Sequence, residues 1–188
     1  MNTERLKNKR IAILATNGFE ESELEIPKIT LETHGARVDI VSPENETIKS
    51  WKDGNWGRDF AVDVNLNDAN ADNYNALILP GGVINPDLLR REDRAVNFVR
   101  TFFKQHKPVA AICHGPWMLA EAGVLEGRDI TSYYSIRTDM KNAGANWHDK
   151  AVVVDQGLVT SRSPEDLEAF NDKIIEEVLE GKHAEQTV

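Results

Sequence analysis

With 188 residues, 40% of them hydrophobic and 28% charged, the chain has the composition of an ordinary globular domain rather than a disordered or fibrous one. Its 22 basic and 31 acidic residues leave a net charge of −9, which disfavours stable binding to nucleic acid or to an anionic membrane surface. One cysteine excludes an intrachain disulfide, and no run approaches the roughly 18 apolar residues that span a bilayer. We therefore expect a cytoplasmic protein whose residues 1–188 form one domain, with flexible ends at 1–8 and 182–188.

The first part of the chain alternates between strand and helix patterns. Residues 9–15 form a near-continuous apolar run, which is typical of a strand covered on both faces in a parallel sheet. A helix is predicted over 22–35, where Ser22 and Glu25 have the spacing of a capping box. Residues 36–41 then alternate between apolar and polar side chains and predict a second strand.

The remainder of the chain continues this alternation after a weaker stretch. Two short strands are predicted at 48–51 and 60–64, with a glycine-rich loop at 52–58 between them. The later elements are a strand at 75–79, an amphipathic helix at 90–106, a strand at 109–112, a helix at 136–143, a hairpin at 151–160 and a helix from Ser163 to about Glu180. Such alternation predicts a doubly wound α/β sandwich with a mostly parallel central sheet.

The only cysteine stands where a predicted strand meets a predicted helix. The apolar run 109–112 leads directly into Cys113, and His114 and the pair Gly115-Pro116 follow before the helix. So abrupt a turn would hold the cysteine at the apex of an elbow with its side chain outward. A helix N-terminus and a neighbouring imidazole both favour thiolate over thiol. The alternative is a structural cysteine buried at the end of a strand.

Two other segments are expected at the same edge of the sheet, because the carboxyl ends of parallel strands lie together. Glu20 is the first acidic residue after the first strand, and a carboxyl group beside a thiol can act as a general acid or base. It could equally be a solvated residue that complements the helix dipole. Gly81 and Gly82 follow the strand at 75–79, where they either direct backbone amides at a ligand or form a plain turn.

These segments together resemble those of a known protein family. The run Ala111-Ile112-Cys113-His114-Gly115-Pro116, with Leu79-Pro80-Gly81-Gly82 and Gly18-Phe19-Glu20, resembles the DJ-1/PfpI family, in particular its PfpI-like branch of intracellular protease I and stress proteins. Segments at 142–145, 152–155 and 159–162 also resemble that branch. The motifs occur in the right order, so the resemblance covers nearly the whole chain.

The resemblance implies a flavodoxin-like sandwich with a cysteine nucleophile elbow. It assigns the nucleophile to Cys113, the supporting carboxylic acid to Glu20 and the adjacent histidine to His114. It also implies a homodimer or larger homo-oligomer, in which a carboxylate of the neighbouring subunit reaches this histidine from just after the Pro-Gly-Gly turn. Asp87 is the candidate for that carboxylate, in place of the glutamate of the PfpI pattern and in a loop one residue longer.

Members of the family are described as proteases, glyoxalases, deglycases and stress chaperones. A thiol beside a carboxylic acid suits addition to an aldehyde, with the amides of Gly82 and His114 as oxyanion donors. We therefore predict a stress-protection enzyme that acts on reactive carbonyls, such as methylglyoxal or its protein adducts, without a cofactor. Gly81, Trp117 and Tyr133 are predicted to line the substrate site.

Several alternatives remain open. A cysteine peptidase needs a histidine that protonates the leaving amine, and His114, directly after Cys113, is expected to point away from the thiol. A redox-responsive chaperone would instead oxidise Cys113 to a sulfinic acid held by Glu20. A glutamine-amidotransferase-like site would need the segment His183-Ala184-Glu185 near the elbow. No pair of histidines has metal-ligand spacing, so no metal site is predicted.

Overall fold

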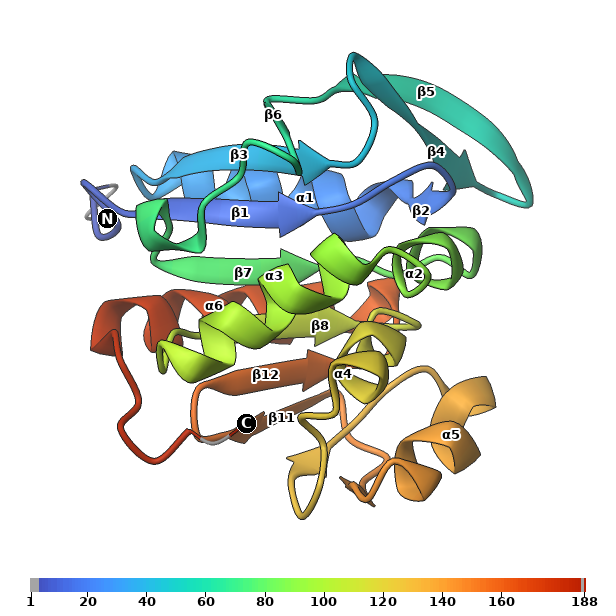
Figure 1. Cartoon of the computed structure of the whole chain (residues 1–188), viewed down its shortest axis with the longest axis vertical. Coiled ribbons are helices and arrows are strands. Elements are labelled where there is room, and N and C mark those ends of the chain that lie inside the picture. Colours follow the sequence, from blue (N-terminus) through green and yellow to red (C-terminus); the bar gives the residue numbers. More distant parts are fainter. Residues whose placement is uncertain (1–3, 187) are drawn as a thin grey trace.

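A seven-stranded sheet forms the centre of the structure, a computed structural model that describes residues 4–186 and 188 (Figure 1). The strands lie in the order β11-β12-β8-β7-β1-β3-β6, and all neighbours are parallel except β11 and β12. Their bounds are β1 Arg10–Leu14, β3 Arg37–Ser42, β6 Val64–Asn65, β7 Ala76–Leu79, β8 Val109–Ile112, β11 Val152–Asp155 and β12 Leu158–Ser161. The predicted α/β sandwich with a mostly parallel central sheet is confirmed.

Helices cover both faces of this sheet. The α-helices are α1 Glu21–Thr33, α2 Ile84–Leu89, α3 Asp93–Lys104, α4 Pro116–Ala122, α5 Arg137–Asn142 and α6 Leu167–Glu180. Short 3₁₀ turns occupy Ala71–Asn73, Tyr134–Ile136 and Pro164–Asp166. Helices α1 and α6 pack on one face, whereas α3 and α4 pack on the other (Figure 1). Within the described residues, none of these helices is long and apolar enough to cross a bilayer.

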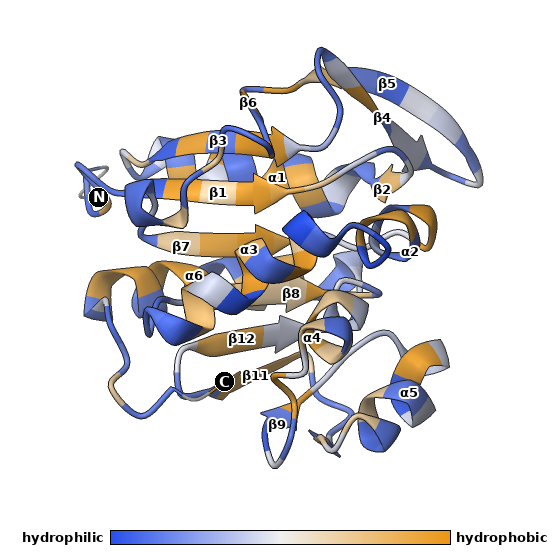
Figure 2. Cartoon of the chain, in the orientation of Figure 1, coloured by the Kyte–Doolittle hydropathy of each residue, from blue (hydrophilic) through white to orange (hydrophobic). Residues whose placement is uncertain are grey.

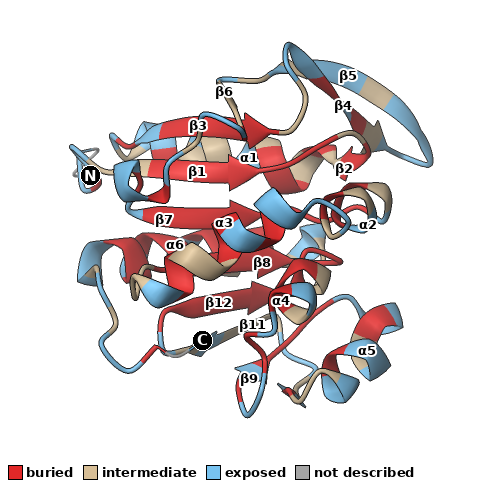
Figure 3. Ribbon diagram, viewed as in Figure 1, coloured by how far each residue is buried: buried red, intermediate tan, exposed pale blue. Residues whose placement is uncertain are grey.

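The central strands are apolar at consecutive positions because each strand contributes to two cores. Ile13 of β1 belongs to the cluster that contains Leu24 of α1 and Phe170 of α6. Its neighbour Leu14 points to the opposite face and belongs to the cluster that contains Phe102 of α3. The strands are accordingly both hydrophobic and buried along their length (Figures 2 and 3). A continuous apolar run is the expected pattern for strands covered on both faces.

A β-hairpin arm extends beyond the carboxyl ends of the main strands (Figure 1). It consists of β4 Thr47–Lys52 and β5 Asn55–Ala61, and the two-residue strand β2 Phe19–Glu20 pairs with β4. The loop predicted over 52–58 is therefore wrong, because most of it is strand β5. Trp51 and Trp56 lie opposite each other on the arm, with ring centroids 5.4 Å apart in an edge-to-face arrangement. A second small ladder joins β9 Asp129–Ile130 to β10 Asn146–Trp147.

Both ends of the described chain pack against the domain. Leu6 is fully buried, and its N–H donates to the carbonyl of His34 over 2.8 Å. At the other end Gln186 is 1% exposed, and its carbonyl lies 2.8 Å from Nδ1 of His106. Leu6 and Gln186 thus contact the domain, and the flexibility of 1–8 and 182–188 stays a prediction.

Candidate active site

Cys113 occupies the turn between β8 and α4 in a strained backbone conformation. Its φ of 62° lies in the left-handed region, which residues other than glycine rarely adopt. Two backbone bonds hold it there: its N–H donates to Ser161 O over 3.1 Å, and its carbonyl accepts from Tyr133 N over 2.9 Å. The turn is also tight, because a Cβ on Gly115 would lie 2.4 Å from the carbonyl oxygen of Leu79. The predicted elbow is thus present, and its strain is maintained by neighbouring strands.

The carboxyl group beside the thiol belongs to Glu23, in the first turn of α1. Its side chain is fully buried, and Oε2 accepts a 2.8 Å hydrogen bond from Gly81 N–H. Burial raises the pKa of Glu23 to about 8, against the lowering effects of the Gly81 bond and of the interaction with Cys113. Oε1 has no hydrogen-bond partner among the described residues. One oxygen of Glu23 is therefore without a protein partner, and burial favours the protonated form of the group.

The structure places Glu23 against the thiol, rather than Glu20, to which the resemblance assigns the supporting carboxylic acid. Glu20 precedes α1 in an extended conformation and lines the same cavity, but within the described part of the chain the interaction with Cys113 is made by Glu23. Its side chain accepts a weak 3.4 Å bond from Ser22, so the predicted capping box does not form either. The helical spacing offered a signal for Glu23. It lies four residues before Pro27, so both residues face the same buried side of the helix.

His114 points toward the thiol, contrary to the expectation that adjacency would turn it away. Nδ1 lies 3.2 Å from Sγ of Cys113, and Nε2 lies 3.1 Å from Oγ of Ser135. Tyr133 stacks on the imidazole at 4.9 Å, and Trp117 meets it edge-on at 5.1 Å. Burial lowers the pKa of His114 to about 4, so the ring is neutral at physiological pH.

Burial also decides the protonation of the nucleophile. It raises the pKa of the Cys113 thiol, and the neighbouring Glu23 carboxylate raises it further. The backbone N–H groups of Gly82 and His114 point at the sulfur and act in the opposite direction. Burial and the Glu23 carboxylate thus oppose the thiolate-favouring effect expected at this elbow, and they raise the pKa of the thiol. The thiol needs a base to remove its proton before it can attack a substrate.

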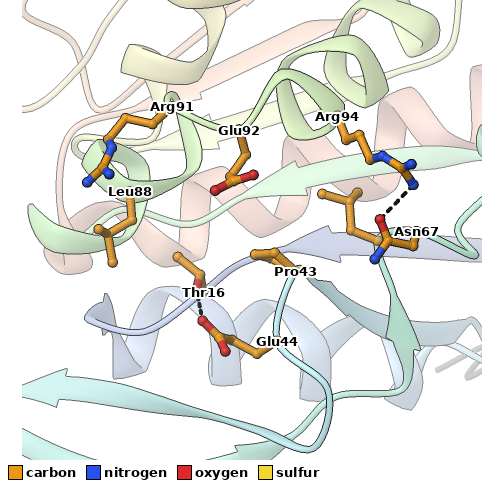
Figure 4. Close-up of a pocket in the computed structure, with 9 residues that line it drawn as sticks. Thr16, Pro43, Glu44, Asn67, Leu88, Arg91, Glu92 and Arg94 are labelled. Carbon is orange, nitrogen blue, oxygen red and sulfur yellow. Dashed lines mark hydrogen bonds between the residues drawn. The ribbon is translucent and has the colours of Figure 1, made fainter.

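A cavity of about 360 Å³ opens onto the thiol. It is lined by Gly18, Glu20, Glu23, Trp51, Gly82, Val83, Ile84, Cys113, His114, Tyr133 and Pro164. No lysine or arginine lines it, and most of its accessible wall is apolar. A cavity of about 400 Å³ lies near the ends of β1 and β3, where Glu44 accepts a bond from Thr16 and Arg94 donates to Asn67 (Figure 4). This second cavity is larger, but neither cysteine nor histidine lines it. The reactive side chains therefore identify the cavity at Cys113 as the candidate active site.

The remaining predicted site residues are distributed unevenly around the cavity. Gly82 and Tyr133 line it, as expected. Gly81 holds Glu23 through its N–H group, and Trp117 packs behind His114 with its indole N–H bonded to Asp139. Neither of these two residues lines the cavity.

Asp87 lies apart from this group within the same chain. It is exposed on α2 and does not line the cavity around Cys113. A contact between Asp87 and His114 of another subunit stays a prediction. The amidotransferase alternative is wrong, because His183 bonds to the backbone of His106, before β8 begins, whereas Cys113 follows the other end of that strand.

The pKa of Glu23 predicts a pH dependence of stability. The folded state holds this proton up to about pH 8, whereas the unfolded chain releases it near pH 4.5. The resulting stabilisation is fully present below pH 4.5 and is lost as the pH rises to 8, at up to roughly 1.4 kcal/mol per pH unit. We expect the free energy of unfolding of the wild type to fall relative to Glu23→Gln between pH 5 and 8, in urea titrations.

His114 does not obscure this difference. Its lowered pKa adds stability above pH 6.5 that is lost as the pH falls toward 4, and both proteins share that contribution. Parallel stability curves for the two proteins between pH 5 and 8 would contradict a raised pKa at Glu23.

The structure combines a mostly parallel α/β sandwich with a strained cysteine elbow. A buried carboxyl group lies beside the thiol, and two backbone N–H groups point at the sulfur. These features are those of a flavodoxin-like domain with a cysteine elbow. Residues 9–177 match the model of the DJ-1/PfpI family, and the chain belongs to that family. It is 45% identical over 161 residues to "Deglycase PfpI" of Pyrococcus furiosus, covering 86% of this chain and 94% of that one.

Other relatives carry different names. The chain is 44% identical over 164 residues to "Putative cysteine protease YraA" and to "General stress protein 18", both of Bacillus subtilis, covering 87% of this chain and 95% and 94% of theirs. Among solved structures, Drosophila melanogaster DJ-1beta matches with a TM-score of 0.83 at 28% identity, over 91% of this chain and 90% of that one. A two-domain Anabaena variabilis protein with a ferritin-like domain matches with a TM-score of 0.85 at 37% identity, and this chain spans 90% of its own length and 48% of that protein.

Proposed function

We propose that the protein is a cysteine-dependent enzyme that converts small reactive carbonyl compounds, of the glyoxalase or deglycase type. The observation that carries this proposal is the juxtaposition of Cys113 with the buried carboxyl group of Glu23, which interact with each other and line one cavity. Buried polar atoms almost always have a partner, and Oε1 of this carboxyl group has none among the described residues, so the group retains capacity to bind a reacting atom.

The first step is addition of the sulfur to an aldehyde carbon. In its ionised form Glu23 accepts the thiol proton, and Sγ of Cys113 forms the bond to carbon while the carbonyl electron pair moves to oxygen. The N–H groups of Gly82 and His114, which point at the sulfur, lie where they stabilise this developing oxyanion. Return of the proton from Glu23 to that oxygen completes a hemithioacetal.

The second step moves one proton between neighbouring carbons. With methylglyoxal, removal of the proton from the former aldehyde carbon gives an enediol, and return of a proton to the ketone carbon gives a thioester of a hydroxy acid. Glu23 suits this exchange because its pKa of about 8 leaves both protonation states accessible near neutral pH. Water then hydrolyses the thioester and restores the thiol. The net reaction adds one water to methylglyoxal to give lactate and needs no oxidant or cofactor.

The walls of the cavity favour uncharged substrates. Glu20 and Glu23 are the ionisable carboxylates among the lining residues, and no cationic side chain lines the cavity to bind a phosphate or carboxylate group. Trp51, Val83 and Tyr133 supply apolar and aromatic surface. A neutral dicarbonyl, or the same group attached to a thiol or an amine, therefore fits the site better than an anionic metabolite.

The orientation of His114 favours a second candidate function, peptide hydrolysis. Cys113, His114 and Ser135 form a chain of contacts at 3.2 and 3.1 Å, in the order nucleophile, base and orienting group. The compact cavity and the low pKa of the imidazole weigh against it, because a peptidase must hold a protonated histidine for the leaving amine.

An assay panel on the wild type and Cys113→Ala tests both candidates. It contains methylglyoxal, a hemithioacetal of methylglyoxal with a small thiol, and a fluorogenic peptide. We expect the wild type to consume the first two compounds, Cys113→Ala to act no faster than buffer, and neither protein to cleave the peptide. Equal loss of methylglyoxal in both proteins would overturn the carbonyl assignment, and cysteine-dependent cleavage of the peptide alone would replace it with the peptidase.

A further inference from the structure

The C-terminal end of α6 carries a second cluster of ionisable side chains. It lies at the amino ends of the parallel strands, whereas Cys113 lies at their carboxyl ends (Figure 1). Glu177 and Glu180 lie three residues apart on this helix and therefore on one face. His183 follows three residues later, after Gly181 turns the chain with a φ of 91°. One ligand atom from each of the three side chains lies within 4.8 Å of the others.

The contact between Glu177 and His183 is not an ordinary hydrogen bond. Nε2 of His183 lies 3.1 Å from Oε2 of Glu177, within ion-pair distance, yet this buried nitrogen makes no hydrogen bond among the described residues. The Glu177 side chain is only 7% exposed, so water does not readily compensate either atom. An imidazole nitrogen and a carboxylate oxygen that face each other in this way form an arrangement suited to a shared cation.

The two atoms are close enough to bind one ion together. In tetrahedral protein sites the nitrogen and oxygen ligands of Zn²⁺ lie about 2.0–2.2 Å from the ion, which places neighbouring ligand atoms about 3.3–3.6 Å apart. The observed separation of 3.1 Å is slightly shorter, so binding of an ion would move the two atoms a few tenths of an ångström apart. Glu180 is exposed, so its carboxylate is free to complete the set.

The position of His183 is fixed by the surrounding chain. Its N–H donates to His106 O over 2.9 Å, and its carbonyl accepts from Gln186 N over 2.9 Å. Its ring lies against Gly157, where an added Cβ would come within 2.6 Å of Cδ2. The imidazole is therefore held in place before any ion arrives, which lowers the entropic cost of binding.

We propose that Glu177, Glu180 and His183 bind a divalent transition-metal ion of the Zn²⁺ class, which fastens the C-terminal segment to the end of α6. One imidazole with two carboxylates favours such ions over Ca²⁺ and Mg²⁺, which prefer oxygen alone. The carboxyl end of a helix and a chain with a net charge of −9 both attract cations. Positions 177, 180 and 183 include a single histidine, so a search of the sequence for paired histidines does not find this cluster.

Calorimetric titration of Zn²⁺ into EDTA-treated protein without a histidine tag tests this site. All proteins carry Cys113→Ala, which removes the only thiol and with it any zinc site at the elbow. We expect one equivalent to bind, and at least about tenfold weaker affinity after His183→Ala or Glu180→Gln. Glu176→Gln is the matched control, because Glu176 lies on the same helix and pairs with Lys173.

The variant Glu180→Gln and the melting temperature distinguish loss of the metal site from loss of folding. Glu180→Gln changes an exposed side chain, so it remains folded even if His183→Ala does not. Zn²⁺ should raise the melting temperature of the parent and of Glu176→Gln but not that of Glu180→Gln. Absence of one-equivalent binding to the parent, or equal affinity in Glu180→Gln and Glu176→Gln, would overturn the proposal.

Discussion

Replacing Glu23 with glutamine is expected to lower kcat/KM for methylglyoxal by 10²- to 10⁴-fold, the usual range for loss of a general acid–base group. Glutamine keeps the size of the side chain and can still accept the bond from Gly81 N–H, but it cannot exchange a proton. The matched variant Glu20→Gln should stay within a factor of a few of the wild type, because the carboxyl group that interacts with Cys113 is that of Glu23. Steady-state assays that measure kcat/KM of both variants therefore test which of the two carboxyl groups takes part in the reaction.

A second measurement separates the acid–base role of Glu23 from a structural one. The ionised carboxylate of Glu23 raises the pKa of Cys113, so its removal should speed alkylation of the thiol by iodoacetamide at pH 9, above the pKa of Glu23. Slower turnover together with faster alkylation is the pattern expected of Glu23→Gln. If Glu20→Gln loses as much activity as Glu23→Gln, or if Glu23→Gln remains fully active, the carboxyl assignment is wrong.

Replacing Gly81 with alanine should disable the site by steric conflict alone. Its φ does not lie in the left-handed region, but an added Cβ would come within 2.6 Å of both Cys113 Cβ and Glu23 Oε2. Separating these groups should lower the free energy of unfolding by roughly 1–3 kcal/mol, as overpacking does, and reduce activity by at least about 100-fold. Urea titrations and the methylglyoxal assay measure the two effects.

Gly123→Ala is the control for this substitution. Gly123 ends α4 with a φ of 68°, and no atom lies within 4 Å of an added Cβ. The change should therefore lower stability by about 1–2 kcal/mol through backbone strain and leave the activity of the folded protein intact. Wild-type activity in Gly81→Ala would show that the carboxyl group and the thiol need not remain in contact.

The elements that local sequence determines were predicted well. The apolar runs at 9–15 and 109–112 became β1 and β8 because strands buried on both faces need apolar residues at every position. The periodicity of 90–106 became α3, with its apolar side chains buried. The glycine-rich stretch at 52–58 was misread because strand β5 is largely exposed and lacks an apolar alternation.

The placement of side chains at the site depended on where each helix begins. One residue of register turns a helix by about 100°, so the choice between Glu20 and Glu23 required knowing that Glu20 lies in β2 and α1 starts at Glu21. The orientation of His114 depended on ring contacts with Trp117 and Tyr133. Tyr133 comes from a distant part of the chain, so the sequence does not show that it stacks on the imidazole. The short helix α2, which places Asp87 away from the thiol, was not predicted at all.

The sequence by itself determined the class of fold, the alternation of its central strands with helices, and the position of Cys113 at a strand-to-helix elbow, because hydrophobic periodicity and turn residues act locally. Only the tertiary structure decided which carboxyl group meets the thiol, in which direction burial moves each pKa, and that His183 returns to the end of α6. Those properties depend on contacts between residues up to 90 positions apart, such as Glu23 and Cys113, and on the water that those contacts exclude.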